Sequence, residues 1–149
     1  MNIKEELFKE CLLYVEKRRK TIEDIITSNK KALLSETKSS AGDKHETGRA
    51  MLQLEMEKAG QQIQNVEKMS ETLHKMDISK PSDFARIGSI IYTEKANYFL
   101  AISIGQIVVD QTSYFVISSA SPIGKLLLGK RKGDRINFNG NSIKISSIQ

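Results

Sequence analysis

The fold of this chain is decided by the stretch Ser39-Ser40-Ala41-Gly42-Asp43-Lys44-His45-Glu46. Its first four residues, Ser39-Ser40-Ala41-Gly42, form a short break between two long segments with helical spacing of their apolar residues, 3–38 and 44–76. No proline occurs before Pro81, so neither segment has to bend or stop. A break this short brings the second helix back alongside the first. We therefore predict an antiparallel helical hairpin whose far end carries the acidic turn.

Apolar residues in both segments recur at steps of three, four or seven, which is the pattern of a coiled-coil seam. In the first segment they are Phe8, Leu12, Val15, Ile22, Ile26 and Leu33, and in the second they are Leu52, Met56, Ala59, Ile63, Val66 and Leu73. At 1.5 Å rise per residue each helix is about 50 Å long. Because such narrow seams need a partner, we expect each helix to pack against the other.

The composition changes near residue 78. Residues 1–77 hold 14 basic and 14 acidic residues, whereas residues 78–149 hold 9 basic and 4 acidic ones, so the second part carries the whole net charge of +5. The stretch Ile78-Ser79-Lys80-Pro81-Ser82 between them is typical of a linker. We predict a hairpin domain at 1–77, a linker at 78–82 and a second domain at 83–149.

The second domain shows the period-two, β-branched pattern of strands. The predicted strands are 88–93, 98–104, 114–118, 135–138 and 142–148. Asn139-Gly140 predicts a tight hairpin between the last two. Ser121-Pro122 opens a short helix, 123–128, which Gly129 ends. The predicted fold class is therefore α+β: an N-terminal antiparallel α-helical coiled-coil hairpin, then a small antiparallel β domain with one short helix.

Composition also bounds the class of protein. One cysteine, Cys11, excludes an internal disulfide framework. No apolar run approaches the ~20 residues of a membrane span, and the N-terminus lacks the apolar segment of a signal peptide, so we expect a cytoplasmic protein with no membrane partner. The basic second domain indicates an acidic partner, either a protein surface or a nucleic acid.

The acidic turn has two readings. Asp43 and Glu46 are three residues apart, so on a helix their carboxylates share a face and could hold Mg²⁺, which prefers oxygen ligands. The same spacing fits a capping box, in which both side chains bind backbone N–H groups at the start of the second helix. Spacing alone leaves both readings open.

The run from Ser121 to Asp134, SPIGKLLLGKRKGD, resembles the C-terminal signature of the bacterial Gre factors, GreA and GreB. The acidic turn and the order and sizes of the two modules resemble the same family, so the resemblance covers nearly the whole chain. It implies an FKBP-like C-terminal domain. It also implies a transcription elongation factor that binds RNA polymerase, inserts its hairpin into the secondary channel and stimulates cleavage of backtracked RNA. The factor would not itself be an enzyme, because the cleavage activity belongs to the polymerase.

The resemblance also implies roles for individual residues. By position, the carboxylates of Asp43 and Glu46 match the pair that holds a catalytic Mg²⁺ jointly with the polymerase, so we expect no cofactor of the protein's own. Basic residues near the turn are candidates for contact with the nascent RNA near its 3′ end: Lys38, Lys44 and Arg49. The part of the second domain that matches the polymerase-facing segment is Ser121, Pro122 and Ile123. We expect a monomer.

The turn departs from the family pattern. Lys44 and His45 stand where one apolar and one small polar residue are usual, and Thr47 replaces the common Asn. An alternative function is therefore a Gre-like channel binder that inhibits or regulates transcription without cleavage. A second alternative is direct nucleic-acid binding by the basic domain, which lacks an aromatic RNA-binding motif. A prolyl isomerase or chaperone is suggested only by the implied fold, and fold does not imply function.

Overall fold

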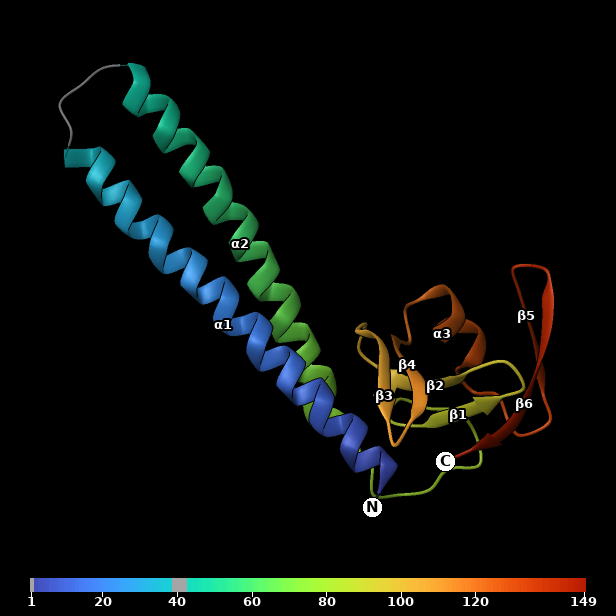
Figure 1. The fold of residues 1–149 in the computed structure, drawn as a ribbon. Coiled ribbons are helices and arrows are strands. Elements are labelled where there is room, and N and C mark those ends of the chain that lie inside the picture. Colours follow the sequence, from blue (N-terminus) through green and yellow to red (C-terminus); the bar gives the residue numbers. More distant parts are fainter. Residues whose placement is uncertain (1, 39–42) are drawn as a thin grey trace. The chain divides into compact units, whose positions relative to one another are not determined.

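The computed structural model describes residues 2–38 and 43–149, without the side chains of residues 36–38 and 43–46. Figure 1 shows the order of the elements along the chain. The chain divides into two compact units, one formed by Val15–Ser70 and the other by Met1–Tyr14 together with Glu71–Gln149. Because this division cuts through the long helices, the domain boundaries at 77 and 83 stay predictions.

Two long helices form the N-terminal part, as predicted. Helix α1 spans Ile3–Lys38 with 36 residues, and helix α2 spans Asp43–Lys75 with 33 residues. Glu5 and Glu6 lie in the first turn of α1, where the positive end of the helix dipole favours carboxylates. No helix within the ranges 2–38 and 43–149 is long and apolar enough to cross a membrane.

The seam of α1 lies one residue away from the predicted one near the N-terminus. Cys11 is fully buried, whereas Leu12 is 38% exposed. The buried positions follow steps of three, four and seven; they are Lys4, Leu7, Cys11, Val15, Ile22 and Asn29 on α1, and Ala59, Val66 and Leu73 on α2. The predicted seam residues Val15, Ile22, Ala59, Val66 and Leu73 are therefore confirmed. Lys4 and Asn29 are polar residues at buried positions of this helix, where the pattern calls for apolar ones.

Arg19 joins the two helices within the unit Val15–Ser70. Its Nη2 lies 3.1 Å from Glu67 Oε1 on α2, and its Nη1 also pairs with Glu16 one turn earlier on α1. The Nε of Arg19 donates to the same Glu67 oxygen at 3.2 Å. A guanidinium that holds two carboxylates in this way ties the helices together at that level.

The unit formed by Met1–Tyr14 and Glu71–Gln149 contains a six-stranded sheet in the order β3-β4-β2-β1-β6-β5, and we call it the sheet unit. The strands are β1 Ile90–Thr93, β2 Asn97–Ala101, β3 Gly105–Val109, β4 Thr112–Ser118, β5 Arg135–Phe138 and β6 Asn141–Ile148. The predicted antiparallel pairing holds for the described strands except that β4 pairs with β2 in parallel. The sequence analysis did not predict β3. This strand follows β2 in the chain and forms one edge of the sheet, and β4 then lies between β3 and β2.

Helix α3, Pro122–Leu127, covers this sheet beside β4 and β5 (Figure 1). Its buried side chains join a core of aliphatic residues: Ala85, Ile91, Leu100, Ile123, Leu127, Ile136, Ile143 and Ile145. Asn139 and Gly140 form the predicted turn between β5 and β6, with positive φ of 52° and 79°. The predicted architecture, a helical hairpin followed by a mostly antiparallel sheet with one short helix, is therefore confirmed.

Candidate functional site

The acidic turn lies at the end of the hairpin where α1 ends and α2 begins. Asp43 is the first residue of α2 and Glu46 follows within its first turn. The side chains of Asp43, Glu46, Lys38 and Lys44 lie outside the described ones, so their predicted roles stay predictions. Arg49, the remaining candidate for RNA contact, is exposed on α2.

The donor set at this turn suits a magnesium ion only in part. Two carboxylates supply hard oxygen ligands, which Mg²⁺ prefers, but the ion takes six ligands in all. Elsewhere in the described part of the chain, no three His, Cys, Asp or Glu residues come together as a metal site. Two carboxylates cannot complete that ligand set, so the predicted magnesium site at Asp43 and Glu46 stays a prediction of a site shared with another molecule.

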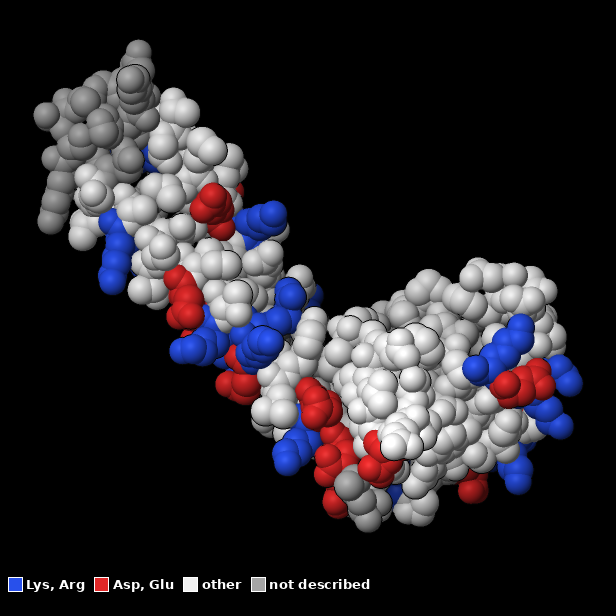
Figure 2. All heavy atoms as spheres, viewed as in Figure 1, with Lys and Arg blue, Asp and Glu red and all other residues white. Residues whose placement is uncertain are grey.

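Figure 2 shows how charge is distributed over one face. Basic and acidic side chains alternate along the hairpin, whereas the viewed face of the sheet carries few charges away from one end. Mixed charge along a helix keeps it solvated without favouring a partner of either sign.

The N-terminus of α3 is held by Ser121. The Oγ of Ser121 accepts a hydrogen bond from Gly124 N at 3.0 Å and donates one to Ser118 O at 2.7 Å. Pro122 occupies the first turn and is exposed, a position at which its missing N–H costs nothing. Of the three residues predicted to face a polymerase, Ser121 is half-buried and Pro122 is on the surface.

Ile123 lies in the core and is only 9% exposed, next to Leu127, which is fully buried. The side chain of Ile123 is therefore part of the core, and its predicted role in polymerase binding stays a prediction. A helix of six residues has to bury its aliphatic side chains to hold its place on the sheet, and Ile123 is one of them.

Two glycines in the rest of the Ser121–Asp134 run have backbone conformations that favour glycine. Gly129 has a φ of +83°, and its N–H donates to Ala85 O at 2.7 Å. Gly133 has a φ of +90°, and its N–H donates to Ile145 O at 2.8 Å. Both glycines adopt a conformation that a side chain would strain. Their place in the run follows from backbone geometry.

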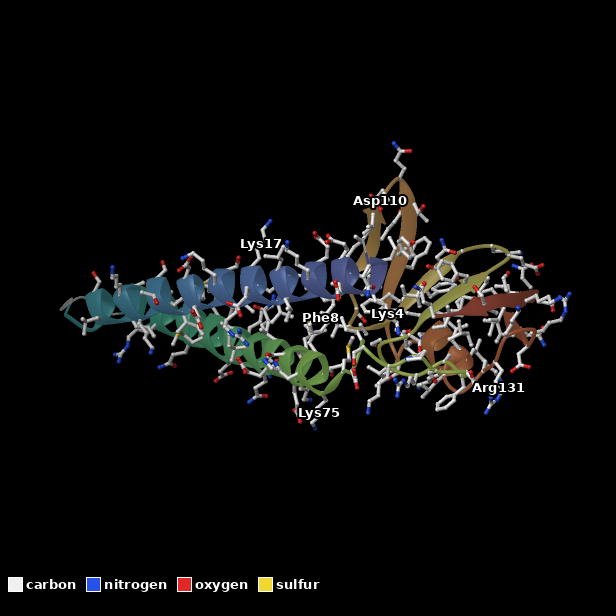
Figure 3. The ribbon with its side chains drawn as sticks, turned by 90° about the horizontal axis from the view of Figure 1, so that it is seen from below. Lys4, Phe8, Lys17, Lys75, Asp110 and Arg131 are labelled. Atoms are coloured by element: carbon white, nitrogen blue, oxygen red, sulfur yellow. The ribbon has the colours of Figure 1, made fainter. Side chains whose placement is uncertain are left out.

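An exposed apolar surface, which the sequence analysis did not identify, is formed by part of this run and the segment at Phe84. Phe84 is 42% exposed and Leu128 is 46% exposed. The segments that carry them run side by side, because Ala85 N donates to Lys130 O and Phe84 pairs with Arg131 in an isolated bridge. The guanidinium of Arg131, labelled in Figure 3, lies 5.7 Å from the centroid of the Phe84 ring. We call Phe84, Leu128 and Arg131 the aromatic–basic surface. Two signals mark it in the sequence, an isolated aromatic after the linker and the Lys130–Lys132 cluster.

The base of α1 carries a buried lysine. Lys4 is only 6% exposed, and it is labelled in Figure 3. Burial lowers the pKa of Lys4, and the positive charge of Arg86 lowers it further, whereas Asp77 acts in the opposite direction. Asp77 in turn accepts from the backbone N and the hydroxyl of Ser79, and the hydroxyl bond is the main cause that lowers the pKa of its carboxyl.

Cys11 does not have the character of a nucleophile. Burial, and secondarily the charge of Glu10, raises the pKa of its thiol to about 12. The thiolate is the reactive form of cysteine, and at neutral pH a thiol of this kind stays protonated. Cys11 therefore acts as a packing residue of the seam.

Comparisons with known proteins add one structural likeness. No protein-family model matches the chain, and no curated protein matches it significantly. Among solved structures, the chain is similar to the GreA factor homolog 1 (Gfh1) protein of Thermus thermophilus, with 18% identity over 95% of this chain and 94% of that one. The TM-score is 0.34, and at that value we base no argument on the likeness.

Proposed function

We propose that this protein is a transcription elongation factor of the Gre type, which binds RNA polymerase and inserts its hairpin into the secondary channel. The observation that supports it is the pairing of helices α1 and α2, 36 and 33 residues long, with an acidic turn at their junction and a sheet unit that carries the Ser121–Asp134 run. A rod of about 50 Å can carry a charged turn into a deep channel.

The turn delivers ligands to a metal that the polymerase already holds. When bound there, Mg²⁺ stabilises charge on the oxygens of the scissile phosphodiester and lowers the pKa of a bound water. Asp43 and Glu46 supply carboxylate oxygens to that ion. Lys38, Lys44 and Arg49 neutralise phosphates of the backtracked RNA near its 3′ end. The protein has no cofactor of its own and performs no cleavage alone.

Docking is the task of the sheet unit. Residues 78–149 carry a net charge of +5, which draws the protein toward an acidic surface. Ser121 and Pro122 provide part of the contact, whereas Ile123 contributes by holding α3 in place. The aromatic–basic surface adds an aromatic and an arginine, which are enriched in the energetic centres of protein interfaces. One factor binds one polymerase, as a monomer.

A second candidate function is regulation of the polymerase without cleavage. The observation that favours it is Lys44, a cation placed between the two carboxylates in sequence. An ammonium at this position weakens the attraction of the pair for a divalent cation. In that case the hairpin occupies the channel and slows transcription.

The experiment that tests the proposal uses a stalled, backtracked elongation complex of the cognate polymerase. We expect the wild-type protein to shorten the RNA from its 3′ end when Mg²⁺ is present. Asp43→Ala and Glu46→Ala should each abolish the shortening while retaining polymerase binding. Glu23→Ala, which removes an exposed carboxylate in the middle of α1, is the matched control and should cleave like the wild type.

The outcomes separate the two functions. Binding with slower elongation and no shortened RNA would favour regulation over cleavage. Full cleavage by both Asp43→Ala and Glu46→Ala would disprove the metal role of the turn. Absence of polymerase binding would refute the proposal as a whole.

A further inference from the structure

The sheet has two edges, and the strand at one of them, β3, lacks the usual protection of an edge. The strand order ends at β3, Gly105–Val109, so no strand in the described part of the chain pairs with its outer side. Its sequence, Gly-Gln-Ile-Val-Val, contains no charged residue and no proline, and its register with β4 is continuous. Native proteins usually protect edge strands with charges, prolines or bulges, because the unpaired main chain of an edge can bind another strand.

The opposite edge, β5, does carry such protection. It is a strand of only four residues, and Arg135 and Asn137 are exposed on it. The Nη1 of Arg135 lies 4.0 Å from Glu94 Oε1, so charged side chains border this edge. Of the two edges, β3 is therefore the one that offers an uncharged main chain to a partner.

The turn Asp110-Gln111 determines which main-chain groups of β3 point outward. Its two residues have positive φ, as in a two-residue hairpin turn, so the hydrogen-bonded pair next to the turn is Val109 with Thr112. Hydrogen-bonded and non-hydrogen-bonded pairs alternate from there along the two strands. Gln106 and Val108 belong to the non-hydrogen-bonded pairs, and the N–H and C=O groups of both residues therefore point away from β4. No main-chain group of a described residue outside the β3–β4 pair bonds to them.

An apolar stripe lies beside this open main chain. Val108 is 61% exposed, and Phe115 of β4 is 38% exposed. The register places Gln106 opposite Phe115, which puts Val108 on the same face of the sheet as Phe115. Tyr98 of β2 is half-buried and pairs with Phe115, and their ring centroids are 6.0 Å apart. We call Val108, Phe115 and Tyr98 the edge stripe.

We propose that β3 is a docking edge, which binds an extended segment of a partner protein as an additional strand of the sheet. The outward N–H and C=O groups of Gln106 and Val108 exchange hydrogen bonds with the main chain of the segment. Every second side chain of the segment lies over the edge stripe, so these side chains are apolar. The segment is uncharged along this contact, because neither β3 nor the edge stripe offers a charged group to pair with. Figure 3 shows the end of the β3–β4 hairpin, at Asp110, projecting from the rest of the sheet, where a segment can reach it.

A second copy of this chain fits the edge less well than such a segment. If two β3 strands pair in antiparallel orientation about Ile107, Val108 of one copy lies opposite Gln106 of the other, and an amide covers a valine poorly. If they pair about Val108, Gln106 falls opposite Asp110, where the chain has already turned toward β4, and fewer main-chain bonds form. A segment with valine or isoleucine at every second position has neither restriction.

This inference goes beyond the proposed function and does not depend on it. The residues of β3 and of the edge stripe are not among those assigned to the polymerase or to RNA. A test that uses the intact protein and synthetic peptides keeps the two proposals separate.

The test titrates the full-length ¹⁵N-labelled protein with the peptide acetyl-Thr-Val-Thr-Val-Thr-amide and follows the protein by NMR. We expect saturable shifts of the backbone amides of Gln106 and Val108 and of their neighbours on β4. Two methylated forms of this peptide, identical in composition, show whether its main chain pairs with β3. N-methylation of both valines removes the donors that face β3 and should weaken binding about tenfold or more. N-methylation of the central and last threonines changes the far side of the added strand, so this form should bind within about twofold of the unmodified peptide.

Two protein variants test the edge itself. Val108→Lys places a charge on the open edge, as natural edge strands do, and should weaken binding of the unmodified peptide about tenfold. Asn137→Lys is the matched control, because Asn137 is exposed and holds the equivalent place on β5, one residue before the last of a strand that ends in a two-residue turn. This control should bind like the wild type. Both variants should melt like the wild type, since both positions are exposed.

The outcomes decide both the edge and its occupant. Wild-type affinity of Val108→Lys, equal binding by the two methylated peptides, or no saturable shift with the unmodified peptide would overturn the docking edge. Self-association of the peptide-free protein in analytical ultracentrifugation, lost in Val108→Lys and kept in Asn137→Lys, would show that a second copy occupies the edge and would overturn the partner segment.

Discussion

Gly124→Ala is predicted to be among the most damaging single-methyl additions in the sheet unit. A Cβ on Gly124 would lie 2.0 Å from Ser118 O and 2.8 Å from Ser121 Oγ. Carbon atoms normally keep about 3.5 Å from such neighbours, so the backbone has to separate by about 1.5 Å. Because Ser118 O also accepts from the Ser121 hydroxyl, that movement breaks the cap of α3.

The magnitude follows from these two effects. Losing the N-cap costs about 0.5–2 kcal/mol, and forcing a group into occupied space costs about 1–3 kcal/mol. We therefore expect the free energy of unfolding of the sheet unit to fall by about 2–5 kcal/mol. Guanidinium unfolding followed by tyrosine fluorescence measures it, because the chain has no tryptophan and Tyr92, Tyr98 and Tyr114 lie in this unit.

Gly60→Ala is the matched control. A Cβ on Gly60 meets nothing within 4 Å, and the residue lies inside helix α2. Alanine is the better helix former, so this change should raise the melting temperature of the hairpin by an amount worth about 0.5–1 kcal/mol. If Gly124→Ala unfolds within 0.5 kcal/mol (roughly the size of a neutral surface change) of the wild type, the close approach at α3 is not what requires glycine there.

Three further predictions follow from burial. Pro122→Ala should stay folded and weaken polymerase binding, whereas Ile123→Asp should unfold the sheet unit, because it buries a charge without a partner; circular dichroism and a binding assay on both variants check this, and a folded Ile123→Asp variant would contradict it. Cys11, with a pKa of about 12, should resist iodoacetamide at pH 8 until denaturant is added, and rapid labelling of the native protein would show that the thiol is accessible. Lys4→Met should be more stable than the wild type at pH 7. Because the pKa of Lys4 is lowered in the folded state, its charge destabilises the fold at any pH below the folded-state pKa, and this destabilisation disappears as the pH rises past the ordinary value of 10.5. The stability advantage of the variant, measured by urea unfolding, should therefore shrink toward pH 10.5. An advantage that grows with pH would contradict the burial of the Lys4 charge beside Arg86.

The sequence predicted the helices well because their signals are local. The absence of proline before Pro81 and the repeated apolar spacing determine where α1 and α2 can run. The exact face of α1 was harder, because Cys11 and Leu12 are neighbours and leucine is the more apolar of the two. The structure buries Cys11, since it lies in line with Leu7 and Val15 at steps of four residues.

The sheet was predicted less completely because strand pairing depends on distant residues. Ile102 and Ile104 extend the apolar run of β2, which concealed the start of β3 at Gly105. The turn that returns β3 to β4 uses Asp110 and Gln111 with positive φ of 50° and 64°, and Gln gives no signal for that conformation.

The candidate site residues were also predicted only in part from the sequence. The roles of Asp43 and Glu46 come from a resemblance, because a capping box has the same spacing. The burial of Asn29 gave no signal in the sequence, since an asparagine among polar residues indicates a solvent-exposed position. Only the packing of α1 against α2 shows that its amide is buried.

The central place of β1 determines the order in which this protein can fold as it is synthesised. Strand β1 pairs with β2 just after it but also with β6, and Tyr92 of β1 bonds to Gln149, which lies 57 residues further along the chain. Contacts between α1 and α2 need only a short loop closure, whereas this strand pairing needs a long one and is slow to form. The hairpin can thus form while the sheet is still incomplete on the ribosome. Until β6 emerges, β1 keeps an unpaired apolar edge, and the nascent chain passes through a stage that is prone to aggregation.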